Sequence, residues 1–174
     1  MKNAMIAKPF VIRCMGIAVL SMLSVPSWAE NGILIRPHLG MGYTNASGEG
    51  TSGRSTLIGS RFMLSAGGNK SYGLEVSYID AYARQDDKPD TEYLAVGIVL
   101  EKKPFEFLNM GIGTIGYLGM GDNTDNPFGI VTNLGWEPEY KGNITPYISL
   151  RSEWIFDDTT LKINTLSAGI RFRF

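Results

Sequence analysis

The sequence predicts an all-β fold, an eight-stranded antiparallel up-and-down transmembrane β-barrel. Three observations lead to this prediction. Apolar and polar side chains alternate with a period of two over eight segments. Short and longer connectors follow one another in strict alternation. Charged residues inside the segments are arginine and glutamate on one glycine-rich face, whereas the lysines after residue 30 lie in the connectors or near the segment ends.

The first 29 residues have the pattern of a secretory signal peptide. Lys2, Lys8 and Arg13 form a basic region, an apolar run of suitable length follows, and small residues surround a predicted cleavage site after Ala29. The apolar run is too short to span a membrane as a helix. We therefore divide the chain into a signal peptide at 1–29 and one barrel domain at 30–174.

The composition of the barrel domain narrows its function classes. Residues 30–174 contain no cysteine and carry a net charge of −4, so the exported domain has no disulfides and no basic field of the kind that binds nucleic acid. The 21 glycines of the chain are too many for a helical protein and have no collagen-like period.

Eight segments carry the alternation, and no helical pattern of useful length competes with them. In chain order they are 33–44, 56–65, 71–80, 91–101, 107–119, 128–137, 144–156 and 161–174. The third segment shows the division clearly, with Tyr72 and Leu74 on one face and Gly73 and Glu75 on the other. Pro37 in the first segment predicts a bulge or a local irregularity, because proline cannot donate a ladder hydrogen bond.

Two residues of the fifth segment depart from the pattern. Ile115 and Tyr117 fall on the polar face, which predicts a second bulge.

The connectors and the lysines decide which face meets lipid. Three connectors are turn-like and alternate with four mostly longer ones, as in membrane barrels that have tight turns at one end and elaborated loops at the other. A sheet facing water would carry lysines along its strands. Their absence from mid-strand positions favours an apolar face turned to lipid around a narrow polar lumen.

Aromatic residues on the apolar face are predicted to form two rings around the barrel. Amphipathic aromatic side chains favour the two lipid–water interfaces of a membrane, where such rings would lie. Near the tight-turn end the ring comprises Tyr72, Trp136, Phe172 and Phe174. Near the longer connectors it comprises Tyr43, Tyr78, Phe128 and Trp154.

Over residues 30–174 the chain resembles the small OmpA/OmpX-type outer-membrane barrels. The resemblance rests on the number of strands, the asymmetry of the connectors and the closing sequence GIRFRF. It implies a location in the bacterial outer membrane, contact with membrane lipid and lipopolysaccharide, and a C-terminal Phe174 that the assembly machinery reads as a signal. The even number of strands predicts both termini in the periplasm.

An eight-stranded barrel is only wide enough for its own side chains, so inward charges must be paired there. The predicted lumen network comprises Arg36, His38, Arg61, Glu75, Arg151, Glu153, Arg171 and Arg173. Arg61 falls opposite Glu75 if the hairpin pairs Ser65 with Ser71. The C-terminal arginines need acidic partners, with Glu75, Glu101 and Glu137 as the candidates. We expect this network to plug the lumen, with no cofactor.

Two further groups of residues invite a functional interpretation. His38, the one histidine, could be the catalytic base of a lipid A deacylase or acyltransferase, but no His-x-Ser pair is present and a hydrogen-bonded lumen histidine fits better. Seven aspartates lie in predicted loops: Asp86, Asp87, Asp90, Asp122, Asp125, Asp157 and Asp158. They lack the full spacing of a calcium loop, so we predict solvated charge and no metal site.

These features favour a structural or interaction protein over a catalyst. The predicted role is a plugged, porin-like barrel that anchors short acidic external loops, which are available to an external protein partner. A narrow channel for small solutes is the alternative, and an enzyme built on His38 is the third reading.

Overall fold

The computed structural model describes residues 32–46, 52–67, 69–81, 91–120, 126–138, 142–157 and 160–174. These residues form eight strands: β1 (Ile33–Ala46), β2 (Ser52–Gly67), β3 (Lys70–Ala81), β4 (Thr91–Phe105), β5 (Leu108–Met120), β6 (Phe128–Trp136), β7 (Ile144–Phe156) and β8 (Leu161–Arg173). No helix within these described ranges is long and apolar enough to cross a membrane. The predicted signal peptide lies outside the described residues.

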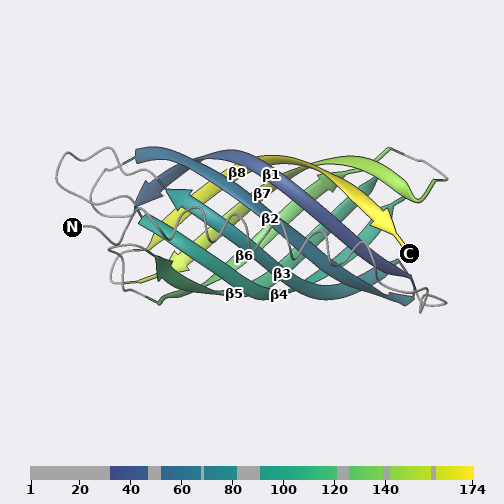
Figure 1. Ribbon diagram of the computed structural model, residues 1–174, viewed down its shortest axis with the longest axis horizontal. Helices are drawn as coiled ribbons and strands as arrows, with labels where there is room; N and C mark the ends of the chain where they lie inside the picture. Colours follow the sequence, from purple (N-terminus) through teal and green to yellow (C-terminus); the bar gives the residue numbers. More distant parts are fainter. Residues whose placement is uncertain are drawn as a thin grey trace, which may run out of the picture.

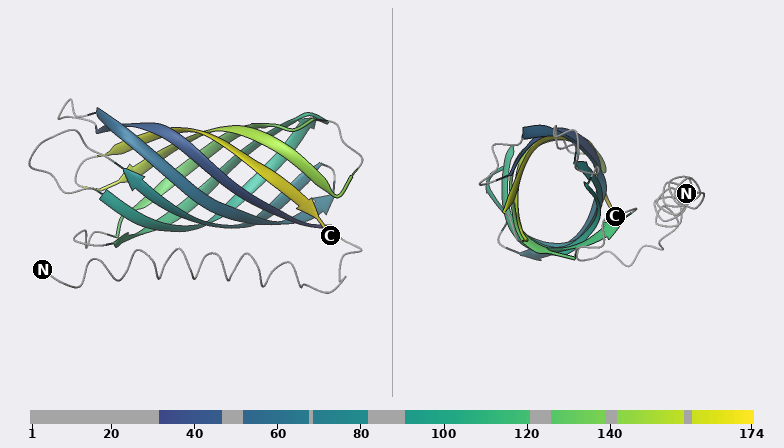
Figure 2. Two further views of the ribbon diagram at one scale, coloured as in Figure 1. Left: turned by 45° about the horizontal axis from the view of Figure 1, so that its top comes forward. Right: turned by 90° about the vertical axis from the view of Figure 1, so that its left-hand side faces the viewer.

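The strands close into one barrel, which confirms the predicted fold class (Figure 1). Each strand pairs antiparallel with the next one in sequence, and β8 pairs with β1 from Leu34↔Arg173 to Ala46↔Leu161. A view along the axis shows the resulting closed ring (Figure 2). Because no strand edge is left open, all ladder groups can be paired within the sheet, as a membrane interior requires.

We name the two ends of the barrel by their connections. The turn end holds the β2–β3, β4–β5 and β6–β7 connections together with the C-terminus, and the loop end holds the other four connections. At the turn end the backbone N–H of Phe174 donates to the carbonyl of Ile33, so the chain terminus is fixed to the first strand.

The outer surface of the barrel is apolar. Large side chains such as Leu39, Ile98 and Leu150 are more than half exposed, at 64%, 57% and 53%. Water would make so extensive an apolar surface costly, whereas hydrocarbon does not. The eight aromatic residues of the predicted rings also lie on the outer surface, where Phe128 packs against Phe156 with 5.4 Å between ring centroids.

The bulge predicted at Ile115 and Tyr117 is wrong. The registers of β5 with β4 and with β6 are continuous through this region, and both side chains point into the lumen and are buried. Pro37 also lies in an unshifted register, although no β8 partner is assigned to Arg36 or Pro37, so the irregularity there is local. The register shifts instead near the turn end, between Ser65 and Gly67 in β2 and between Lys102 and Phe105 in β4.

Replacing Leu150 by arginine tests the membrane-facing surface. Leu150 lies at the middle of β7, and a lipid-facing arginine near the bilayer midplane costs about 2–4 kcal/mol of folding free energy. Asn45→Arg, at the loop end of β1 on the same surface, should cost roughly 0–1 kcal/mol. Urea titration in lipid vesicles, followed by the mobility of unboiled protein on gels, measures both. Equal costs for the two variants would show that this surface does not face a bilayer.

Candidate functional site in the barrel lumen

Charged side chains fill the lumen from the turn end to just past its middle. Buried in it are Arg36, Arg61, Glu75, Glu101, Glu137, Arg151, Glu153 and Arg171. They come from every strand except β5 and β6, with Glu137 following directly after β6. Alternation along each strand directs them inward, because their neighbours in sequence take the lipid-facing positions.

Glu137 is the centre of the ion pairs at the turn end. Its Oε1 lies 3.2 Å from Nη2 of Arg36, and its Oε2 lies 2.6 Å from Nζ of Lys103 and 2.5 Å from Nη1 of Arg171. Burial by itself raises the pKa of the Glu137 carboxyl. The attraction of Arg36, Lys103 and Arg171 lowers that pKa by a larger amount, so the net pKa lies below its ordinary value. The group is therefore held as a carboxylate.

A second set of ion pairs continues from Arg36 toward the middle of the barrel. Glu101 pairs with Arg36 and, through Oε1, with Nη1 of Arg61 at 3.0 Å. Nε of Arg61 in turn lies 2.6 Å from Oε2 of Glu75. Glu75 also pairs with Arg151, whose Nη2 lies 2.8 Å from Oε1 of Glu153. Cations and carboxylates thus alternate without interruption from Glu137 to Glu153.

The strand register explains why this order of charges is needed. Arg61 lies directly opposite Glu75 across β2 and β3, and Ser65 lies opposite Ser71. Arg36 lies directly opposite Arg61 across β1 and β2, a like-charge pair that destabilises a sheet by itself. Glu101 reaches these two arginines from β4 and neutralises the repulsion.

Neutral groups complete the contacts of the carboxylates. The Ser77 hydroxyl donates to Glu75 at 2.8 Å, and the Asn109 amide donates to Glu137 at 3.0 Å. Space for these side chains comes from glycine: a Cβ at position 111 would collide with Asn133 and Glu101.

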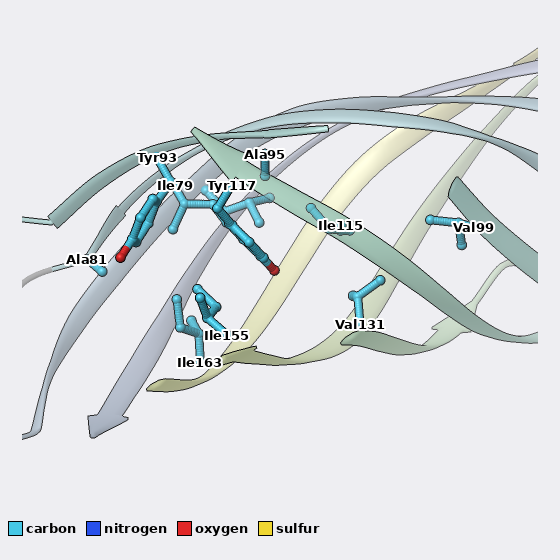
Figure 3. Close-up of a cluster of buried hydrophobic side chains, with 11 residues drawn as sticks. Ile79, Ala81, Tyr93, Ala95, Val99, Ile115, Tyr117, Val131, Ile155 and Ile163 are labelled. Carbon is cyan, nitrogen blue, oxygen red and sulfur yellow. The ribbon is translucent and has the colours of Figure 1, made fainter. Parts of the chain in front are cut away.

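A buried apolar cluster lies toward the loop end of the lumen (Figure 3), beside buried hydroxyl residues such as Thr44, Ser55 and Thr165. The cluster comprises Leu57, Ile79, Ala81, Tyr93, Ala95, Val99, Ile115, Tyr117, Val131, Ile155 and Ile163. Tyr117 joins it to the ion pairs, because its hydroxyl donates to Oε1 of Glu153 at 2.8 Å while its ring packs edge-on against Tyr93 at 5.6 Å between centroids. We name these eleven residues the apolar cluster.

His38 lies in the lumen wall on β1, 5% exposed. Its Nδ1 is 3.1 Å from the carbonyl oxygen of Arg36 and donates to it, and its Nε2 has no hydrogen-bond partner among the described residues. The residues opposite it on β2 and β8 are Gly59 and Gly169, so neither strand offers a nucleophile there. Within the described ranges, no three histidine, cysteine or carboxylate side chains are grouped so as to hold a metal ion.

Arg173 differs from the position predicted for it. It has the inward parity of β8, but it lies at the mouth of the barrel, is exposed, and forms no ion pair with a described residue. The other seven predicted lumen residues are buried. Of the predicted acidic loop residues, Asp157 is described and exposed, and the rest lie outside the described residues: Asp86, Asp87, Asp90, Asp122, Asp125 and Asp158.

Two lumen features did not follow from the sequence pattern. The predicted segments 91–101 and 107–119 place Lys103 in the connector between them, but β4 continues to Phe105 and directs this lysine inward. The sequence pattern does not predict the apolar cluster, because its residues occupy the lumen-facing positions of their strands, where the alternation predicts polar residues. Apolar residues on both faces near the longer connectors, as at Ile155 and Phe156, were the available signal.

Replacing Glu75 by glutamine tests the lumen network. The change leaves Arg61 and Arg151 without their shared carboxylate at fully buried positions, and removing one partner of a buried ion pair costs about 3–5 kcal/mol. Glu106→Gln, in the exposed β4–β5 turn, is the matched control and should leave the free energy of unfolding nearly unchanged. Urea unfolding in vesicles measures both. If the two variants unfold at the same urea concentration, water screens the lumen charges.

Comparisons with known proteins agree on the fold. No protein-family model and no curated protein matches the sequence. The structure is similar to Neisserial surface protein A, with TM-score 0.56 and 14% identity over 83% of this chain and 100% of that one. It is similar to the outer membrane protein OprG of Pseudomonas aeruginosa, with TM-score 0.55 and 14% identity over 83% and 96%. A de novo designed transmembrane β-barrel matches with TM-score 0.50 and 11% identity over 81% and 95%.

The outer surface and these likenesses lead to one conclusion. A closed sheet with an aliphatic exterior, aromatic residues toward its ends and a charged interior is built to span a membrane. The chain has the fold of the small eight-stranded outer-membrane β-barrels, as its sequence predicts.

Proposed function

We propose that residues 30–174 form a rigid, plugged outer-membrane barrel with a structural or interaction role, after removal of a signal peptide near Ala29. The observation that supports this proposal is the number of buried side chains that point into the lumen. One connected set of ion pairs runs from the turn end to just past the middle of the lumen, and the apolar cluster lies toward the loop end. The barrel then works through its outer surface and its two ends.

The two parts of the lumen oppose conduction in different ways. An ion that enters from the turn end meets alternating fixed charges whose mutual pairing it would have to break. An ion or a polar solute that enters from the loop end meets a few hydroxyls, such as that of Thr44, and then buried apolar side chains such as Ile79 and Ile155, which cannot replace its hydration. With eight strands, the width of the barrel leaves little room beside these side chains.

The partners follow from the exposed surfaces. The aliphatic exterior contacts the lipid of the outer membrane, and lipopolysaccharide is the lipid expected around the loop end. The acidic external loops are available to an external protein partner. Phe174, which is fixed to β1 by its backbone, is the proposed signal for the outer-membrane assembly machinery.

A conductance measurement tests the plugged lumen. Wild-type protein in a planar bilayer should show no steady open state. The variant Tyr117→Ala/Ile155→Ala shortens two side chains of the apolar cluster and removes the tyrosine bond to Glu153, so it should increase brief leak events. A stable open state in the wild type would instead establish the alternative function, a narrow channel for small solutes.

Mass spectrometry of lipid A tests the enzymatic alternative. Because His38 contacts a backbone carbonyl and faces glycine on both neighbouring strands, expression of the protein should leave the lipid A spectrum unchanged. A new acyl pattern that disappears in His38→Ala, with the variant still showing barrel mobility on gels, would replace the proposed role with a deacylase or acyltransferase.

A further inference from the structure

Two lysines face each other on the outer surface at the turn end. Lys70 begins β3, and Lys102 lies directly opposite it on β4. Both have the lipid-facing parity of Tyr72 and Leu100, the next outward pair, and both are exposed. Like charges directly opposite on neighbouring strands destabilise a sheet unless an anion lies between them.

The protein supplies little negative charge to this pair. On the flanking strands Lys70 faces Gly67 and Lys102 faces Met110, which carry no charge. The nearby carboxylates of Glu101 and Glu137 point into the lumen, where arginines and Lys103 bind them. Neither Lys70 nor Lys102 forms an ion pair with any residue in the part of the chain that the structure describes.

An open cavity of about 390 Å³ lies at the turn end, between the β2–β3 and β4–β5 turns. It is lined by Asn69, Pro104, Phe105, Glu106 and Phe107. Phe105 and Phe107 stack at 5.7 Å between centroids and are 60% and 49% exposed. The cavity is therefore a partly apolar recess that the neighbouring strands leave uncovered.

The two turns are held together by the backbone. The N–H of Lys103 donates to the carbonyl of Asn69 at 2.8 Å, and Asn69 adopts a left-handed conformation with φ of 60°. Lys70 follows Asn69 in sequence and Lys102 precedes Lys103. The bond therefore keeps the two lysines at the same height on the barrel. The one charged residue that lines the recess is Glu106, so the positive charge at this place on the surface comes from Lys70 and Lys102, each next to a residue held by this bond.

We propose that Lys70, Lys102 and this recess bind the phosphate headgroup of an anionic phospholipid in the leaflet at the turn end. The two ammonium groups contact the phosphate, Phe105 and Phe107 cover the glycerol region, and the acyl chains lie along Tyr72, Leu100 and Met110. Lysine side chains suit this position, because their stems lie on apolar surface while their charges reach the headgroup level. The inference requires the membrane-spanning barrel but not a plugged lumen.

Native mass spectrometry of the protein in detergent micelles tests the site. Phosphatidylglycerol and phosphatidylcholine with identical acyl chains are titrated separately, and bound lipid is counted. Because one basic residue near a membrane surface is worth about a fivefold change in affinity, Lys70→Gln/Lys102→Gln should weaken phosphatidylglycerol binding roughly twenty-fold. Binding of phosphatidylcholine should change less than twofold.

The matched control removes two exposed cations at the loop end, with Arg54→Gln/Lys162→Gln, and should bind phosphatidylglycerol like the wild type. Phe105→Ala/Phe107→Ala should weaken the binding of both lipids. Gel mobility before heating verifies that each variant is folded. Wild-type affinity for phosphatidylglycerol in the lysine variant, equal losses in the loop-end control, or equal losses of both lipids in the lysine variant would each overturn the proposal.

Discussion

Closure of the sheet between β1 and β8 is the constraint on which the rest of the structure depends. Hydrocarbon offers no hydrogen bonds to an unpaired strand edge, so a membrane-spanning sheet must return to its first strand. Closure with eight strands also determines the width of the lumen, which admits side chains and little else. Every inward residue must therefore fit beside its neighbours, and the inward charges must find their partners inside the barrel. The unbroken chain of ion pairs from Glu137 to Glu153 meets this requirement.

The charged part of the lumen satisfies this constraint through arginine. A guanidinium has several donors in a fixed plane and can serve two carboxylates at once, as Arg36, Arg61 and Arg151 do. Such buried pairs are not strongly stabilising in sum, because desolvation of the charges offsets much of their attraction. Their effect is on specificity: Glu101 on β4 links arginines on β1 and β2, so a slipped register would leave buried charges unmatched.

The sequence predicts the fold well because a lipid-facing exterior imposes the same period of two on all eight strands. It also predicts the inward direction of Arg36 and the opposition of Arg61 to Glu75, since both follow from parity and hairpin register. The partners across the lumen, such as Glu101 with Arg36, depend on barrel closure and side-chain reach, which no local pattern contains. The bulge expected at Ile115 and Tyr117 was wrong for a related reason: apolar side chains on the lumen face can form a core of their own.

The division of the lumen into two parts bears on where function can reside. Residues of the ion-pair set contact one another, and so do those of the apolar cluster. Removing a charged side chain leaves its buried partner unpaired, and shortening an apolar one leaves a void. The turn-end recess meets the charged set through backbone groups, since the N–H of Glu137 donates to the carbonyl of Phe107 and the N–H of Lys103 to the carbonyl of Asn69. Side chains of the recess can therefore change without removing an ion pair of the lumen. A designed barrel that shares this fold shows that the architecture needs no natural activity. Selection for a binding role can therefore act on the two ends of the protein while the lumen keeps the scaffold rigid.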